Sequence, residues 1–330
     1  TTFAPSSDAS TYPGRSSLKA TYELIMGDIA EAEELVNPAL ILSKEHKAIN
    51  YITKDVVVAL KARAALQMQD YATAAEAATS LIAEGKYPLI NTVEDFTNMW
   101  VFDEGTEVMW KIYMSPDELG SATGTSFWGQ YKQDSTQMQM DYVPSQKLVD
   151  LYADADIRFP AFFAPFKLTV STGASDWLWV FNKYPGNPEL NASLNVDQHF
   201  TNMSKPFRIA EQYLIAAEAY LGLNDLANAG VYLNQLMTSR IAGFQNATYN
   251  DATILMNAIK DERHITIRRM GYKCLDYYAG DYEIFSDPNG RVIELFKTQK
   301  KGWRQRIGKN GLGDIRFAVG HADEYRDPTF

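Results

Sequence analysis

The chain has 330 residues, of which 46% are hydrophobic and 22% are charged, and these proportions are typical of a globular protein rather than a disordered one. Its net charge of −10 and its pI near 5.0 exclude nucleic acid as a favoured partner, because the phosphates would be repelled. The single cysteine, Cys274, excludes an internal disulfide framework and a thiolate metal cluster. No run of apolar residues is long enough for a helix that spans a bilayer.

A first helix is predicted from about residue 18, because apolar residues recur there at steps of four and three along the chain. The residues of this stripe are Leu18, Tyr22, Ile25, Ile29, Ala32 and Val36. Ser16 or Ser17 is placed to cap the start of the helix, and Asn37-Pro38 is placed to end it.

Two helical hairpins are predicted further along the chain. In the first, a helix over 55–69 is followed at Asp70 by a second helix that stops at Gly85. The second hairpin has helices over 208–222 and 226–240. A third helix, over residues 251–279, is expected to close this part of the chain.

The two hairpins resemble each other in sequence, although they lie 155 residues apart. Six residues between Ala64 and Ala74 correspond to six between Ala219 and Ala229, and alanines recur at matching positions. Small residues let antiparallel helices approach closely, as they do in a tetratricopeptide hairpin. We therefore expect the two hairpins to pack together in space.

The region between the hairpins, residues 86–207, has a different character. A strand is predicted over 108–113 and a short helix over 144–152, whereas residues 115–142 and 154–206 lack helical periodicity. Loops over a rigid helical base are where binding residues usually lie. We therefore expect this region to bind the ligand.

The sequence lacks the common catalytic motifs. Its four histidines are scattered without a second ligand at helical spacing, and we expect no metal and no cofactor. Asp150, Asp154 and Asp156 remain candidates for the paired carboxylates of a glycosidase.

Several segments, in order along nearly the whole chain, are similar to the SusD-like (SusD/RagB) family of nutrient-capturing surface lipoproteins. The most specific is the run R-I-A-E-x-Y-L-I-x-A-E-A at residues 208–219. The other matching segments are Gly14 to Ala32, Lys61 to Ala74, Glu107 to Ile112, Pro144 to Arg158, and the pair Glu262-Arg263.

This resemblance implies a protein that binds a ligand without turning it over. It implies a glycan ligand, or a peptide in some members, that is passed to a SusC-like TonB-dependent outer-membrane transporter. It also implies a lipid-anchored position on the outer-membrane surface. The resemblance also implies a further N-terminal portion, with an export signal and a lipid-bearing cysteine, so we expect the printed residues to be the later two-thirds of a longer protein. Val319 to Glu324 stand where the family usually has a Pro-Ile-Pro element. The resemblance further implies that the acids Asp150, Asp154 and Asp156 belong to a structural segment rather than a catalytic site. It also implies that Glu211 and Glu218 serve hairpin packing and capping contacts rather than chemistry.

Aromatic side chains beside amides and charges mark two places where a sugar would bind, since a sugar ring stacks on a flat aromatic and its hydroxyls seek polar groups. The predicted ligand-binding residues are Trp128, Gln130, Tyr131, Asp134, Trp177, Trp179, Asn182 and Tyr184. The alternation of Trp177 and Trp179 predicts a strand with both rings on one face. These rings would serve equally to cover a small core within the loops, whereas Trp100 and Trp110 are expected to be buried.

The expected fold is therefore mainly α, with tetratricopeptide-like hairpins as a scaffold and a loop-rich insertion that contains short strands. We expect residues 1–330 to form a single SusD-like domain, with helical scaffold over 1–85, ligand-binding loops over 86–207, and scaffold with a C-terminal segment over 208–330. A tetratricopeptide-type adaptor for a protein partner remains an alternative, and it would require longer contiguous repeats.

Overall fold

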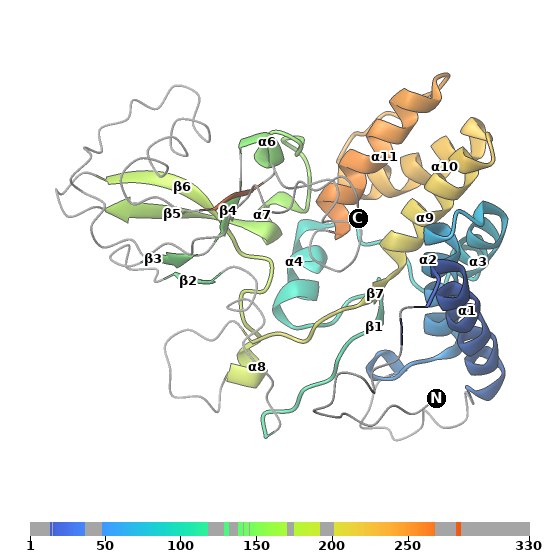
Figure 1. Cartoon of the computed structure of the whole chain (residues 1–330). Coiled ribbons are helices and arrows are strands. Elements are labelled where there is room, and N and C mark those ends of the chain that lie inside the picture. Colours follow the sequence, from blue (N-terminus) through green and yellow to red (C-terminus); the bar gives the residue numbers. More distant parts are fainter. Residues whose placement is uncertain are drawn as a thin grey trace.

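The structure is a computed structural model, and it has a helical part and a part that contains the strands (Figure 1). The helices α1, α2, α3, α9, α10 and α11 form the first part, and short helices accompany the strands in the second. No helix among the described residues combines the length and the apolar character needed to cross a membrane. The described residues are 14, 16–36, 48–117, 129–131, 138–140, 142–144, 146–169, 175–191, 201–267 and 282–284.

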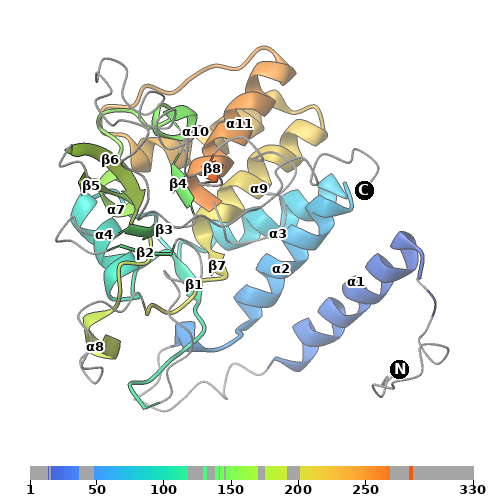
Figure 2. The ribbon, with the colours of Figure 1, turned by 60° about the vertical axis from the view of Figure 1, so that its left-hand side comes forward.

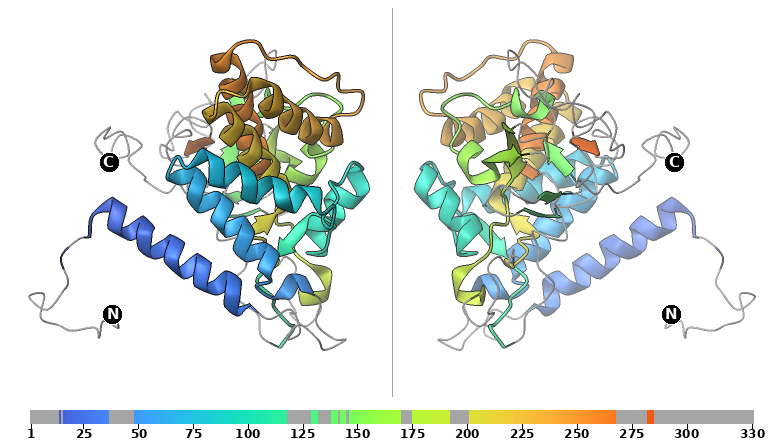
Figure 3. Two further views of the ribbon diagram at one scale, coloured as in Figure 1. Left: turned by 90° about the vertical axis from the view of Figure 1, so that its right-hand side faces the viewer. Right: turned by 90° about the vertical axis from the view of Figure 1, so that its left-hand side faces the viewer.

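Helix α1 (Leu18–Leu35) confirms the predicted first helix. Ser17 caps it, because its hydroxyl accepts a hydrogen bond from the backbone N–H of Ala20 at 3.1 Å. The helix lies at the edge of the helical part (Figures 2 and 3), where it packs on α2 (Lys54–Gln67) through a small cluster around Ile29. A short 3₁₀ helix, η3 (Ala48–Asn50), precedes α2.

The first predicted hairpin is formed by α2 and α3 (Tyr71–Ala83). Gln69 adopts a left-handed conformation (φ 63°) in the turn, and the Asp70 carboxylate accepts a hydrogen bond from the Thr73 N–H at 3.2 Å. Gly85, also left-handed (φ 66°), follows the end of α3, as the sequence predicted.

The second predicted hairpin repeats this turn. Helices α9 (Ile209–Gly222) and α10 (Leu226–Arg240) are joined through left-handed Asn224 (φ 62°) and the capping residue Asp225. Helix α11 (Ala252–Ile267) then packs on α9. The predicted third helix is thus confirmed up to residue 267, and residues 268–279 lie outside the described part of the chain.

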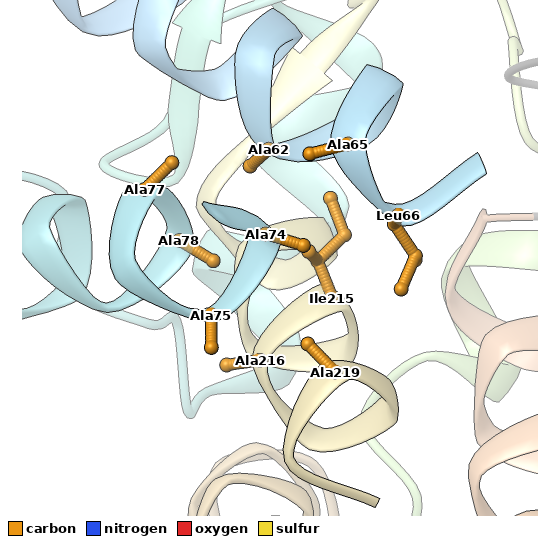
Figure 4. Close-up of a cluster of buried hydrophobic side chains, with 10 residues drawn as sticks. All are labelled: Ala62, Ala65, Leu66, Ala74, Ala75, Ala77, Ala78, Ile215, Ala216 and Ala219. Carbon is orange, nitrogen blue, oxygen red and sulfur yellow. The ribbon is translucent and has the colours of Figure 1, made fainter. Parts of the chain in front are cut away.

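The two hairpins pack against each other, as expected, through α3 and α9. Their interface consists almost entirely of alanines, which bring the helix backbones close together (Figure 4). The cluster comprises Ala62, Ala65, Leu66, Ala74, Ala75, Ala77, Ala78, Ile215, Ala216 and Ala219. At its edge the ring of Tyr71 covers Gly222, where an added Cβ would lie 2.5 Å from the ring carbon Cγ.

Ion pairs between helices confirm that Glu211 and Glu218 serve packing. The Glu211 carboxylate accepts two hydrogen bonds from Arg63 of α2, at 2.9 and 2.5 Å. The Glu218 carboxylate pairs with Arg263 of α11 at 2.6 Å. Each pair ties α9 to a neighbouring helix.

The intervening region begins with α4 (Val93–Val101), a helix that the sequence analysis missed. Strand β1 (Val108–Trp110) follows and pairs antiparallel with β7 (Phe207–Arg208), so the predicted strand is present but shorter. Helix α6 (Gln146–Val149) lies within the predicted helix over 144–152.

The remaining strands form antiparallel pairs. Strand β2 (Gly129–Tyr131) pairs with β3 (Met138–Met140), and β4 (Tyr142–Pro144) pairs with β8 (Tyr282–Ile284). The longest pair is β5 (Phe163–Thr169) with β6 (Ser175–Phe181). The short helices α7 (Phe159–Phe162) and α8 (Pro188–Asn191) flank this hairpin in the sequence.

Trp100 of α4 is the centre of a buried polar cluster. Trp100 is 1% exposed, so the prediction that it is buried is confirmed. Trp110 was also expected to be buried, but it is partly exposed. The Asp103 carboxylate accepts hydrogen bonds from the Lys205 ammonium at 2.6 Å and from the Asn202 amide at 3.2 Å. Lys205 also lies over the Trp100 ring, 5.0 Å from its centroid, so the cluster joins α4 to the segment that leads into α9.

Candidate ligand-binding site

Three aromatic side chains from separate segments meet at the base of the β5–β6 hairpin. The ring of Phe159 makes edge contacts with Tyr152 and Trp179, at centroid separations of 5.6 and 4.9 Å. All three residues are partly exposed. Phe163 lies beneath them, 3% exposed and 5.2 Å from the ring of Tyr152. We call Tyr152, Phe159 and Trp179 the aromatic strip, a supported apolar surface that is open to solvent.

The strand pairing explains why Trp179 reaches the surface. Trp179 lies opposite Pro165, and directly opposite residues of an antiparallel pair share one face. Pro165 is exposed and Trp179 is partly exposed, whereas their neighbour Val180 on the other face is fully buried. On the face of Trp179 the pair formed by Phe163 and Phe181 is buried, and the next pair, Pro165 and Trp179, is the first to reach solvent.

A buried ionic network fixes Phe159. Arg158, the residue before α7, donates hydrogen bonds to both carboxylate oxygens of Asp156, at 2.9 and 2.7 Å. It also binds Glu262 of α11 with two nitrogens and donates to the Thr266 hydroxyl at 2.8 Å. Burial alone would lower the pKa of Arg158, but attraction by Glu262 and Asp156 outweighs it and raises the pKa above the ordinary value. The charged side chain of Arg158 therefore links the start of α7 to α11.

A narrow apolar pocket lies beside the strip. One charged residue lines it, Lys183, which is 3% exposed and whose ammonium lies 4.6 Å from the centroid of Trp100. The other lining residues are Leu148, Tyr152, Phe162, Phe163, Phe181 and Ile265. The pocket has room for about one water molecule, so a sugar would have to bind on the aromatic strip rather than inside the pocket.

Residues 167–266 match the model of the SusD family. The fold matches a SusD superfamily protein from Bacteroides thetaiotaomicron with a TM-score of 0.62 and 23% identity, covering 79% of this chain and 55% of that one. A SusD-like carbohydrate binding protein from Bacteroides vulgatus matches with a TM-score of 0.61, 23% identity, and coverage of 79% and 51%. The chain has a SusD-like fold. A SusD superfamily protein from Bacteroides fragilis matches with a TM-score of 0.64 and 16% identity over 77% of this chain. This chain spans 51–59% of the length of these three structures. Curated protein sequences give no match.

The predicted site residues fall into three groups. Trp128 and Asp134 lie outside the described residues, as do the side chains of Gln130, Tyr131 and Trp177, whose backbones belong to β2 and β6. The strand predicted for Trp177 and Trp179 is confirmed as β6. Ligand contact by these residues stays a prediction.

The second group is Trp179 and Asn182, which are both partly exposed. The backbone N–H of Asn182 donates to the Phe162 carbonyl at 2.8 Å, which places Asn182 at the end of the hairpin near the strip. Trp179 belongs to the strip itself.

Tyr184 forms the third group, because it lies in the core rather than at the surface. It is 2% exposed, and its ring centroid lies 5.3 Å from that of Trp100. Burial raises the pKa of its hydroxyl above the ordinary value, so the group stays neutral. A ligand has no access to this ring, and we exclude Tyr184 from the site.

Two strip residues, Tyr152 and Phe159, were missed by the site prediction. They lie in a segment without regular spacing, where no local pattern indicates which rings converge. The available signal was the adjacent Asp156-x-Arg158 motif, since a buried ion pair fixes the residues next to it.

The carboxylates considered for glycosidase chemistry do not form one pair of free acids. Asp156 is 3% exposed and bound to Arg158, which gives this acid the structural role expected for the segment, while Asp150 and Asp154 are exposed. Within the described residues, no cluster of His, Cys, Asp or Glu is arranged to hold a metal ion.

Proposed function

We propose that this chain is a non-catalytic binding protein that captures oligosaccharides or polysaccharides on the aromatic strip. The carrying observation is the convergence of Tyr152, Phe159 and Trp179 into one partly exposed surface over a rigid base. The apolar face of a sugar ring stacks on such rings, and each contact contributes about 0.5–1.5 kcal/mol beyond burial.

Polar groups beside the strip complete the requirements for a sugar. Asp150 and Asp154 are exposed carboxylates within two residues of Tyr152, and Asn182 supplies an amide at the hairpin end. Carboxylates accept hydrogen bonds from sugar hydroxyls, and an amide both donates and accepts. The matching protein from B. vulgatus is a SusD-like carbohydrate binding protein, and this likeness supports the same ligand class.

We further propose that the bound glycan is delivered to a SusC-like TonB-dependent transporter, and that the protein works at the outer-membrane surface through a lipid anchor. This part rests on the SusD-like fold and on the family match. In this proposal residues 1–330 act as one unit, with the helices as the base and residues 86–207 as the binding region.

A glycan array combined with titration calorimetry tests the proposal. We expect oligosaccharides to bind, and Trp179→Ala to weaken the best ligand about threefold to tenfold, which corresponds to the contribution of one stacked ring. Trp128→Ala is expected to act in the same way. Neither change is expected to lower the melting temperature greatly; for Trp179 the reason is that the side chain is partly exposed.

Two assays separate this function from its rivals. A peptide pull-down identifies a peptide receptor, and an assay for released reducing ends identifies a glycosidase. Binding of peptides but not glycans, or release of sugar ends, would contradict the proposal. A large thermal loss with unchanged affinity would show that Trp179 serves only the fold.

A further inference from the structure

The narrow pocket beside the aromatic strip opens onto the strip. Tyr152 belongs to both, since it lines the pocket and makes an edge contact with Phe159. Among the described residues that line the pocket, Tyr152 alone is partly exposed, and the other six are buried. The mouth of the pocket therefore lies at the Tyr152 end of the surface on which we propose that a sugar ring stacks.

The walls of the pocket suit a small apolar group. Five of them are hydrocarbon side chains, namely Leu148, Phe162, Phe163, Phe181 and Ile265. The space inside holds about one water molecule, and a methyl group is of similar size. A methyl group gains free energy when it leaves water for such walls, whereas a hydroxyl would give up hydrogen bonds to water. The pocket therefore favours a methyl group over a hydroxyl.

The pocket also extends inward from the strip, so a substituent has to project from the sugar ring to fill it. Phe163 forms part of the pocket wall and lies beneath the strip, with its ring centroid 5.2 Å from that of Tyr152. A ring hydroxyl projects by a single bond. In an N-acetyl substituent the methyl carbon lies about 3.8 Å from the ring carbon, as consecutive Cα atoms do across a trans peptide. An N-acetyl group at the mouth therefore has both the reach and the methyl group that the pocket requires.

Polar groups near the mouth can serve the amide of such a substituent. The Lys183 ammonium lies 4.7 Å from the ring centroid of Phe162, which is one wall of the pocket. An ammonium has three N–H donors, so it can donate to the acyl oxygen. Asp150 and Asp154 are exposed within two residues of Tyr152, and a carboxylate accepts from an amide N–H. The amide therefore keeps hydrogen-bond partners when its methyl group is buried.

We propose that the captured glycan carries N-acetyl groups, as N-acetylhexosamines do, and that the pocket formed around Leu148 and Ile265 selects them by taking up the acetyl methyl group. This inference rests on the proposed function and names the class of sugar. The hexosamine ring stacks on the aromatic strip, and its acetamido group turns into the pocket beside Tyr152. The pocket adds selectivity to a surface whose aromatic rings accept many sugars.

The test compares oligosaccharides that differ only in this substituent, titrated into residues 1–330. Chitohexaose and cellohexaose share one backbone and differ in whether each ring carries an acetamido group or a hydroxyl beside its anomeric carbon, and N-acetyllactosamine and lactose form a second pair. We expect the acetylated member of at least one pair to bind about fourfold to tenfold more tightly, the gain from burying one methyl group. The N-propionyl analogue of that member should lose this gain, because its extra carbon exceeds the space in the pocket.

A variant that enlarges the pocket provides a second readout. Leu148→Ala removes a fully buried wall and should reverse the preference, so that the N-propionyl analogue binds at least as tightly as the N-acetyl ligand. Leu236→Ala is the matched control, because Leu236 is equally buried but belongs to the core of the helical part, and it should keep the wild-type preference. Each readout is a ratio of two affinities in one protein, so a partial loss of folded protein does not change it.

If neither pair shows tighter binding of its acetylated member, the inference is overturned, and binding of any other sugar on the array leaves the proposed function standing. An N-propionyl analogue that binds the wild type as tightly as the N-acetyl ligand also overturns it, as does the same ratio in Leu148→Ala and Leu236→Ala, since the methyl group would then lie elsewhere. If Leu148→Ala does not fold, the wild-type comparison alone decides. If no oligosaccharide binds here or on the array, both proposals fail.

Discussion

The Arg158 network gives the sharpest test of how the fold supports the site. The side chains of Asp156 and Glu262 are 1% and 2% exposed, and both depend on Arg158 for a counter-charge. Arg158→Met would leave two buried carboxylates without it. Removing one partner of a buried ion pair costs about 3–5 kcal/mol, a large part of the roughly 5–15 kcal/mol that stabilises a typical domain.

A triple variant separates the charge effect from the loss of packing. Asp156→Asn and Glu262→Gln, added to Arg158→Met, remove the stranded charges and should recover part of the stability. Lys61→Met is the control, because its partner Glu33 lies 3.1 Å away and both side chains are more than a quarter exposed, and such pairs contribute less than about 1 kcal/mol.

Urea unfolding, followed by circular dichroism, measures these free energies of unfolding. A loss of stability in Arg158→Met no larger than in Lys61→Met, or a triple variant no more stable than Arg158→Met alone, would contradict a stabilising buried network. Because Arg158 fixes the start of α7, Arg158→Met should also weaken glycan binding through displacement of Phe159.

Two further predictions concern the helical packing and the buried lysine. Gly222→Ala should lower the free energy of unfolding by up to about 2 kcal/mol, because a clash with Tyr71 of about 1–3 kcal/mol exceeds the gain in helix propensity. In a Tyr71→Ala background the same change should be neutral or stabilising. If the effects of the two changes simply add, the contact between Gly222 and Tyr71 is refuted. Burial lowers the pKa of Lys205 from 10.5 to about 8, although the attraction of Asp103 opposes this shift. Between pH 8 and pH 10.5 the unfolded chain therefore binds more protons than the folded one. The stability of the wild type relative to Lys205→Met should therefore rise with pH across that window, by at most about 1.4 kcal/mol per unit, and a flat difference would contradict the shift.

The helical hairpins were predictable because their signals are local. Asp70 and Asp225 each cap the second helix of a hairpin, and the alanines around them mark close packing before any long-range contact is known. Helix α4 was missed although Thr92 caps it, with its hydroxyl accepting from the Asp95 N–H at 3.1 Å. Its nine residues are too few for a clear apolar period.

The candidate site was less predictable because distant residues build it. Arg158 and Glu262 lie 104 positions apart, and no local pattern connects them to the exposure of Phe159. Tyr184 was misplaced because Asn182, Lys183 and Tyr184 have the composition of a polar loop. In the fold, Lys183 is buried against the ring of Trp100, where its charge is held by the aromatic face.

The most direct test of glycan capture is a titration of the best array ligand into the wild type, Trp179→Ala and Tyr232→Ala. Tyr232 is a partly exposed ring of α10, where it stacks on Tyr220 of α9 in the helical part. The proposal predicts that Trp179→Ala weakens binding about threefold to tenfold and that Tyr232→Ala leaves it unchanged. Equal affinities in all three proteins would contradict capture on the aromatic strip.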